Sequence, residues 1–191
     1  MSRLLAIAVM SVALLPCYAL ADDVYPLEPS PKDLYDLAHA KYYTWGIDTP
    51  WPETDMAIGA VLTLKNIRNW NDSPNDLYIH LLDEAPLGVE THSDTTGNDD
   101  EFAGEGVLLV HYEDLSSTAQ TLQYEFTPAQ IQALNDYGAD GRFALGFDPD
   151  CHFYNCGVEL DIMGAPIPEP ATIFVIAAGG ALVVVRRRRR K

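Results

Sequence analysis

Four side chains that bind cations follow one another in a short segment of this chain: Asp148, Asp150, His152 and Asn155. Two carboxylates and an amide oxygen suit Ca²⁺, which takes many oxygen ligands. Aspartate together with histidine could instead hold a transition metal. The triplet Asp148-Pro149-Asp150 is also a natural turn, because aspartate side chains accept hydrogen bonds from nearby backbone N–H groups. We therefore predict a turn here, with a Ca²⁺ site at Asp148, Asp150 and Asn155 as an additional hypothesis.

A second acidic segment, residues 83–106, has the composition of a long loop. Its run Asp94-x-x-Gly97-Asn98-Asp99-Asp100-Glu101 is rich in oxygen ligands for Ca²⁺, although the spacing is not that of an EF-hand. Loops of this length in a compact domain are usually functional or mobile. A solvated acidic loop explains the same composition, and it is the interpretation that we favour.

Cys151 and Cys156 remain once an N-terminal leader is removed. An exported chain meets an oxidising compartment, so the pair predicts a disulfide that closes a small loop. Two free thiols in tight packing are the alternative. Their spacing fits neither a zinc knuckle nor a CxxC redox pair.

Motifs of the common enzyme classes are missing: the sequence has no GxSxG, HExxH, P-loop or GxGxxG pattern. A glycosidase needs only two facing carboxylates, which an acid-rich chain can supply at any spacing. We expect no catalytic residues and a protein that is not an enzyme, with a hydrolase as the weakest alternative.

The elements that must position these side chains are mostly strands. Apolar and polar residues alternate in several short runs, which polar turn clusters separate. We predict strands at 42–47, 57–67, 77–82, 107–112, 120–126, 142–147 and 158–162. Many short strands favour an all-β fold, an antiparallel, jelly-roll-like β-sandwich with one short helix.

The period of two also predicts which side chains face the core. In 57–67 the core face carries Ile58, Ala60, Leu62 and Leu64. In 77–82, Tyr78 and His80 face outward. Residues 22–32 are expected to form an extended lead-in, and residues 33–41 could form a short helix.

The helix is predicted from its ends. Thr127 is the N-cap, Pro128 occupies the first helical position, and Gln130 completes a capping box. Gly138 is expected to end the helix.

Both termini look like sorting segments. Arg3, an apolar run and Ala19-Leu20-Ala21 predict a signal peptide at 1–21 that signal peptidase cleaves after Ala21. Cys17 suggests a lipoprotein, but Pro16 stands where a small residue is needed.

The C-terminus has three parts. Pro168-Glu169-Pro170 is rigid and extended, residues 171–185 are uncharged and mostly apolar, and a basic tail follows. We predict a transmembrane helix at 171–185. It would span about 22 Å, short of the ~30 Å hydrocarbon core, so it would be a marginal membrane anchor. The tail would stay in the cytoplasm and stop export. It consists of Arg186, Arg187, Arg188, Arg189, Arg190 and Lys191.

This order of parts resembles the PEP-CTERM protein-sorting signal, which we place at 166–191. The resemblance implies a partner, an exosortase, which cuts near the motif, and a route through the inner membrane to the cell surface or an exopolysaccharide matrix. Residues 146–155 also resemble a stretch in the β-sandwich bodies of some PEP-CTERM proteins. An ordinary tail anchor is the alternative, but it does not explain Pro168-Glu169-Pro170.

The body that remains, residues 22–165, is long enough for one domain. It holds 27 acidic and five basic residues, a formal charge of −22. Such a body repels phosphate backbones, so nucleic acid is not an expected partner.

Three functions therefore stay open for the body. The first is a non-catalytic surface or matrix protein. The second is a carbohydrate- or calcium-binding module, which predicts a row of exposed aromatics drawn from Trp45, Trp51, Trp70 and Tyr78. For Trp51 itself, a lid packed on the core is the role that we favour. The third is a secreted hydrolase with a cleft and two carboxylates.

Overall fold

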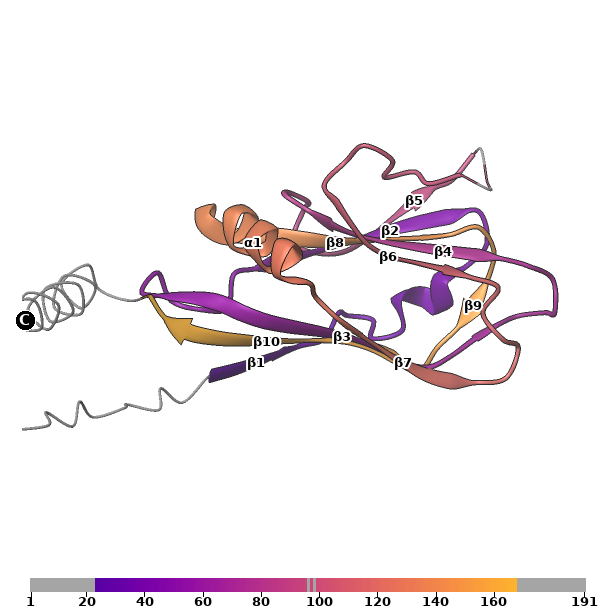
Figure 1. The fold of residues 1–191 in the computed structure, drawn as a ribbon. Coiled ribbons are helices and arrows are strands. Elements are labelled where there is room, and N and C mark those ends of the chain that lie inside the picture. Colours follow the sequence, from indigo (N-terminus) through magenta and orange to yellow (C-terminus); the bar gives the residue numbers. More distant parts are fainter. Residues whose placement is uncertain (1–22, 96, 98, 168–191) are drawn as a thin grey trace, which may run out of the picture.

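The body folds as two antiparallel sheets packed face to face (Figure 1). The computed structural model describes residues 23–95, 97 and 99–167. The all-β sandwich with one short helix is confirmed in this part of the chain. The predicted transmembrane helix lies outside the described residues.

The first sheet has the order β1-β10-β3-β7, and β9 pairs with the end of β3. Its strands are β1 (Asp23–Leu27), β10 (Gly157–Pro166), β3 (Asp55–Asn69), β7 (Gln120–Glu125) and β9 (Phe153–Tyr154). The second sheet has the order β5-β2-β8-β4-β6. Its strands are β5 (Gly88–Ser93), β2 (Lys41–Asp48), β8 (Arg142–Pro149), β4 (Asp76–Leu82) and β6 (Val107–Glu113).

All seven predicted strands are present, and the structure adds β1, β5 and β9. The lead-in contains β1, which pairs with β10 through Pro26 opposite Asp161; proline is tolerated there because β1 is an edge strand. The predicted long loop contains β5, which pairs with β2. Its sequence, GVETHS, has no apolar face. The strand therefore cannot be predicted from alternation, and it forms because it pairs with β2.

The prediction that Ile58 faces the core is wrong. Ile58 is exposed, whereas Ala57 and Ala60 are buried. Met163 pairs with Gly59 and Gly164 pairs with Ala57, so Ile58 is an extra residue in β3 without a partner in β10. This bulge changes the phase of the alternation, and period-two patterns do not predict such changes.

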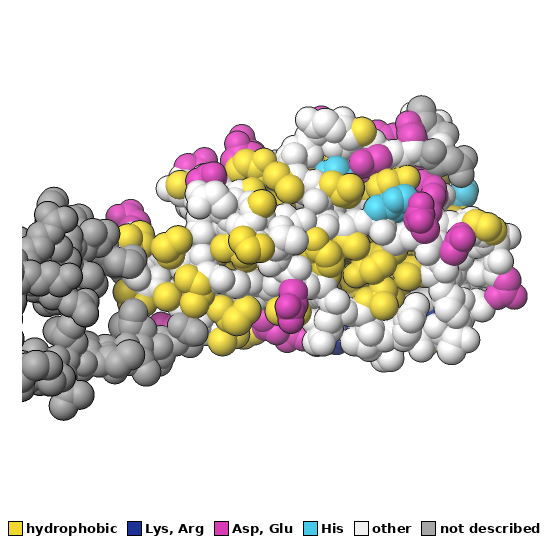
Figure 2. Space-filling view, viewed as in Figure 1, with side chains coloured by type: hydrophobic (Ala, Val, Ile, Leu, Met, Phe, Trp, Pro, Cys, Tyr) yellow, Lys and Arg dark blue, Asp and Glu magenta, His cyan; other side chains and the backbone are white. Residues whose placement is uncertain are grey.

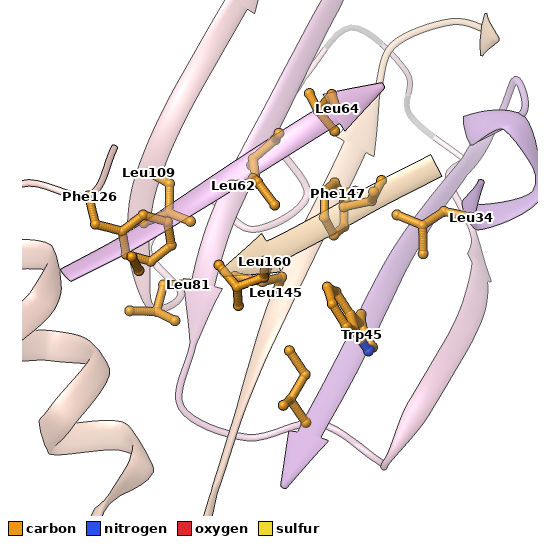
Figure 3. Packing of buried hydrophobic residues seen from close by; sticks show 14 of the residues in the cluster. Leu34, Trp45, Leu62, Leu64, Leu81, Leu109, Phe126, Leu145, Phe147 and Leu160 are labelled. Atoms are coloured by element: carbon orange, nitrogen blue, oxygen red, sulfur yellow. The ribbon is translucent and has the colours of Figure 1, made fainter. Parts of the chain in front are cut away.

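The main core lies between the sheets. Phe143, Leu145 and Phe147 point inward from β8 and meet Leu62 and Leu64 of β3. These side chains are fully buried, and Figure 3 shows four of them beside the neighbouring Leu160. Trp45 also lies in this core.

Helix α1 (Pro128–Tyr137) begins as predicted, with the complete capping box of Thr127 and Gln130. It also ends at the predicted residue, because Gly138 is its C-cap, although the conformation there is not the usual one for a terminal glycine. Gly138 keeps right-handed helical angles, the chain continues in a short 3-10 turn, and Gly141 takes the left-handed conformation at φ 100°. Gly138 is needed for space, because a Cβ there would lie 3.0 Å from the Trp51 ring.

The expected short helix at 33–41 is a single turn, η1 (Leu34–Leu37). All four of its residues have positive φ, from 44° to 60°. Left-handed angles are costly for residues with a Cβ. Complete burial of Leu34 and Leu37 stabilises the turn.

Candidate functional site

Strand β8 is buried on both faces, and its outer face forms the floor of the candidate site. Alternate residues Ala144, Gly146 and Asp148 point away from the main core, toward the loop of residues 94–106. Phe102 of that loop lies directly over Gly146, where a Cβ would be only 2.7 Å from its ring. Phe102, Ala144 and Leu82 form a second, smaller apolar cluster. The loop is therefore packed on the sheet.

Asp148 is completely buried beneath this loop. Its Oδ2 atom accepts a 2.8 Å hydrogen bond from the Glu101 N–H. Its Oδ1 atom has no hydrogen-bond partner among the described residues. Burial raises the pKa of Asp148 to about 7; the charges of Asp94, Asp150 and Asp100 add to the shift, and the Glu101 N–H opposes it.

Three carboxylates of the acidic loop gather above Asp148. Oxygens of Asp94, Asp99 and Glu101 all lie within 4.8 Å of one another. Asp94 is buried, and its Oδ1 atom accepts a 2.9 Å hydrogen bond from the Gly97 N–H. The loop that we expected to be a solvated surface thus holds a compact carboxylate cluster.

His80 and Asp100 hold the loop in place. His80 Nε2 lies 3.0 Å from Asp100 Oδ2, and His80 Nδ1 lies 3.2 Å from the Glu105 carbonyl oxygen. The prediction that His80 faces outward from the core is correct, but its side chain is buried because the loop covers it. Figure 2 shows acidic and histidine side chains gathered side by side over the second sheet.

Asp150 belongs to a neighbouring network at the end of β8. Burial, followed by the nearby Asp76 carboxylate, raises the pKa of Asp150 to about 6. His111 Nε2 lies 3.3 Å from Asp76 Oδ1. The His111 ring stacks on Tyr78 with the ring centroids 4.0 Å apart.

The third residue of the predicted calcium set serves a different purpose. Asn155 Oδ1 accepts a hydrogen bond from the Gly157 N–H, and its Nδ2 atom donates to the Asp33 carbonyl oxygen at 2.8 Å. It therefore clamps the left-handed turn η1 to the start of β10. Asp148, Asp150 and Asn155 take part in three separate networks, and a site built from all three stays a prediction.

The two cysteines are free thiols in the structure. Cys151 Sγ lies 3.5 Å from His39 Nδ1, while Cys156 is exposed. The disulfide is not formed here and stays a prediction.

The aromatic side chains do not form the predicted row. Trp45 and Trp51 are buried in the core, so the core-lid interpretation of Trp51 is confirmed. Its ring stacks on Phe143 at 6.0 Å. Trp70 is 51% exposed and follows the end of β3 in the first sheet, whereas Tyr78 lies in β4 of the second sheet.

A depression of about 720 Å³ opens at the other end of the sandwich, beside α1. Trp51, Met56, Asn135, Asp140 and Ile167 are among the residues that line it. It adjoins the start of β8, whereas Asp148 lies near the end of that strand. At about 3.3 Å per residue, the two places are roughly 20 Å apart.

Sequence reasoning singled out Asp148 but missed its neighbours on the sheet. His80 and Phe102 were not recognised as the groups that hold the loop. Phe102 is the one phenylalanine, tyrosine or tryptophan within residues 83–106, and an isolated aromatic residue in a polar loop is a usable indication of an anchor.

The sorting residues fall outside the described part of the chain. These are Ala19, Ala21, Pro168, Glu169, Pro170 and the tail from Arg186 to Lys191. Within the described ranges, no helix has the length and hydropathy needed to cross a membrane.

Comparison with known proteins identifies the C-terminal segment. Residues 166–190 match the family model of the PEP-CTERM protein-sorting motif. This match supports an exported protein that an exosortase processes from a membrane-anchored precursor. No curated protein matches the chain.

Distant matches to solved structures concern the body. One is a latent aurone synthase (polyphenol oxidase) from natural source, with 14% identity and a TM-score of 0.37 over 67% of this chain and 24% of that one. The recombinantly expressed latent aurone synthase gives 14% identity and a TM-score of 0.39, over 76% and 26%. This chain spans about a quarter of the length of those proteins.

Proposed function

We propose that this protein is a non-catalytic component of the cell surface or extracellular matrix. The observation that carries the proposal is the PEP-CTERM motif at residues 166–190, which begins at the last residue of β10. A motif placed directly after the final strand lets a sorting enzyme cut without disturbing the sandwich. The predicted signal peptide, with cleavage after Ala21, would direct the chain across the inner membrane.

The two aspartates with raised pKa values lie away from the depression beside Trp51, and this separation supports a non-catalytic body. An active site combines a concave pocket with groups of perturbed pKa. The carboxyls of Asp148 and Asp150 have raised pKa values, but neither lines the depression beside Trp51. The loop of residues 94–106 instead covers Asp148, so a substrate has no direct approach to this carboxyl.

The proposal is tested by following the full chain in its native host. We expect the native protein in the surface or matrix fraction, shortened at both ends. A variant with Pro168→Ala and Pro170→Ala should accumulate uncut in the membrane fraction. Pro86→Ala, an exposed proline in a loop, is the control and should be sorted normally.

Two outcomes would overturn this proposal. One is sorting of the Pro168→Ala/Pro170→Ala variant to the surface at the native level. The other is release of reducing sugar from polysaccharides by the purified chain, with loss of that activity in Asp148→Asn.

A carbohydrate-binding body is the second candidate, and one surface favours it. Arg68 pairs with Tyr154 across β3 and β9, and the Trp70 N–H donates to the His152 carbonyl oxygen. Trp70 and Tyr154 are both exposed, and Arg68 lies 5.1 Å from the centre of the Tyr154 ring. Aromatic faces beside hydrogen-bond donors suit the mixed apolar and polar surface of a sugar.

Pull-down with insoluble polysaccharide tests this second candidate. Trp70→Ala should abolish retention of the full chain. Leu108, in β6 of the second sheet, has a similar exposed fraction, and Leu108→Ala should not change retention. Equal retention of native protein and Trp70→Ala would exclude this surface as the binding site.

A further inference from the structure

The carboxylate cluster above β8 has the dimensions of a site for a single ion. Oxygens of Asp94, Asp99 and Glu101 lie within 4.8 Å of one another. Ca²⁺ binds oxygen at about 2.3–2.6 Å, so two ligands on opposite sides of one ion are roughly 5 Å apart. One ion can therefore contact all three side chains with little movement of the loop.

A second feature, the buried carboxylate of Asp148, points to the same ion. Its side chain leaves β8 on the same face as Gly146, which Phe102 covers, and so it points into the underside of the loop. The Glu101 N–H donates to Oδ2, so the carboxylate lies against the backbone of one residue of the cluster. Oδ1 is buried and has no hydrogen-bond partner among the described residues. An ionised oxygen in that position is unstable unless a cation or a donor compensates it.

We propose that Asp94, Asp99, Glu101 and Asp148 form a Ca²⁺ site, in which the first three are ligands and Asp148 supplies a buried negative charge beside them. This site is independent of the sorting function. It joins Asp148, from one of the two calcium sets that the sequence suggested, to three carboxylates of the other, the acidic run from Asp94 to Glu101.

The chemistry of the cluster favours calcium over other metals. All of the proposed ligands are carboxylate oxygens, which hard cations prefer, whereas transition metals favour nitrogen and sulfur. The imidazole of His80, which lies under the same loop, is engaged with Asp100 and the Glu105 carbonyl oxygen. Mg²⁺ demands a stricter octahedral arrangement and keeps several waters.

The proposed ion would neutralise repulsion that the fold otherwise contains. Asp94, Asp99, Glu101 and Asp148 are four acidic groups held close together in a body of formal charge −22. Such a body attracts divalent cations from solution. The ion would also tie the loop to the sheet, so loop order should depend on calcium.

Isothermal titration of the purified full chain in mild detergent, after treatment with chelator, tests the site. CaCl₂ should bind with one-to-one stoichiometry. Asp94→Asn and Glu101→Gln should each weaken binding about tenfold or more, because affinity follows the number of charged ligands. Glu125→Gln, an exposed acid on the other sheet, should bind like the native chain.

The Asp148→Asn variant distinguishes the effect of Asp148 on calcium binding from its effect on the stability of the fold. In chelator this variant should melt at a higher temperature than the native chain, because an uncompensated buried charge is removed. In millimolar Ca²⁺ it should gain less stability than the native chain gains. Both results together support the proposal, and the variant is expected to fold.

Three results would overturn the proposal. The first is no calcium binding by the native chain. The second is native affinity in both Asp94→Asn and Glu101→Gln. The third is equal binding of Mg²⁺ at the same concentration, which would leave a general electrostatic attraction only.

Discussion

The two faces of β8 are equally buried, but by different means. The inner face presents Phe143, Leu145 and Phe147 to the opposite sheet, and apolar packing alone excludes water. The outer face presents Ala144, Gly146 and Asp148 to a loop, which charged residues and one phenylalanine hold in place. Neighbouring residues of one strand thus lie in two different environments. The packing of the inner face should not change with pH or ion concentration, whereas the packing of the outer face should.

This contrast lies in how the described residues of the acidic loop are attached to the sheet. Its contacts with the sheet are Phe102 over Gly146, His80 with Asp100, and Asp148 with the Glu101 N–H. Two of these three contacts involve titratable groups. Conditions in solution should therefore change the outer face while they leave the inner face intact.

The largest effect is expected from the inner face. Phe147→Ala should reduce the free energy of unfolding by about 3–5 kcal/mol, because it leaves a cavity in a tightly packed core. Urea denaturation of the full chain measures the loss, which should be the same with calcium and with chelator. A loss that disappears with calcium would mean that the two faces are not separate.

Asp148 gives the outer face its pH dependence. Burial raises the pKa of Asp148 to about 7, whereas an unfolded aspartate has a pKa of about 3.9. Between these pH values the folded state binds the extra proton, so stability falls as pH rises toward 7 and stays low above it.

The test is urea denaturation of native chain and Asp148→Asn in chelator, from pH 5 to pH 8. The native chain should lose on the order of 2 kcal/mol over this range through Asp148, and the variant should not show this component. Asp136→Asn, on the surface of α1, is a suitable control. Parallel pH curves for native chain and Asp148→Asn would contradict the assignment.

Phe102→Ala sharpens the comparison with Phe147→Ala. The loop can relax into the space that the ring leaves, so we expect a loss of only about 1–2 kcal/mol. Hydrogen exchange should become faster throughout residues 99–106, while the amides of β3 stay protected. Uniformly faster exchange in both sheets would show that the loop is part of the main core.

The smallest effect is expected at the bulge of β3. Ile58→Ser should change the free energy of unfolding by less than about 0.5 kcal/mol, because the side chain is exposed. Leu62→Ser, on the core face of the same strand, is the contrasting variant and should be strongly destabilised. A large loss at Ile58 would mean that the original period-two assignment was right.

Prediction from sequence succeeded where neighbouring residues alone determine the structure. Strand 77–82 is apolar at every second position, and the capping box of Thr127 and Gln130 is a local arrangement, so both are present in the structure. Strand β5 has no apolar face and exists only because β2 lies beside it. The phase change at Ile58 is likewise decided by pairing with β10.

The candidate site shows the same limit. The sequence indicated Asp148 because aspartates and a histidine follow one another in one segment. In the structure, their side chains point in different directions and join separate networks of contacts. Asp94 and Glu101 are far from Asp148 in sequence, and no spacing connects them. They meet because β8 occupies the middle of its sheet, where a loop from the edge can cross its outer face.

By itself, the amino-acid sequence determined the sandwich, the helix start and the sorting motif, since alternation, capping and a linear recognition sequence are all local properties. Tertiary structure alone decided that Asp148 is buried, that His80 is covered and that three carboxylates come within reach of one ion. The physical reason is that burial and charge proximity depend on which strands and loops pack together, and residues distant in sequence set that packing.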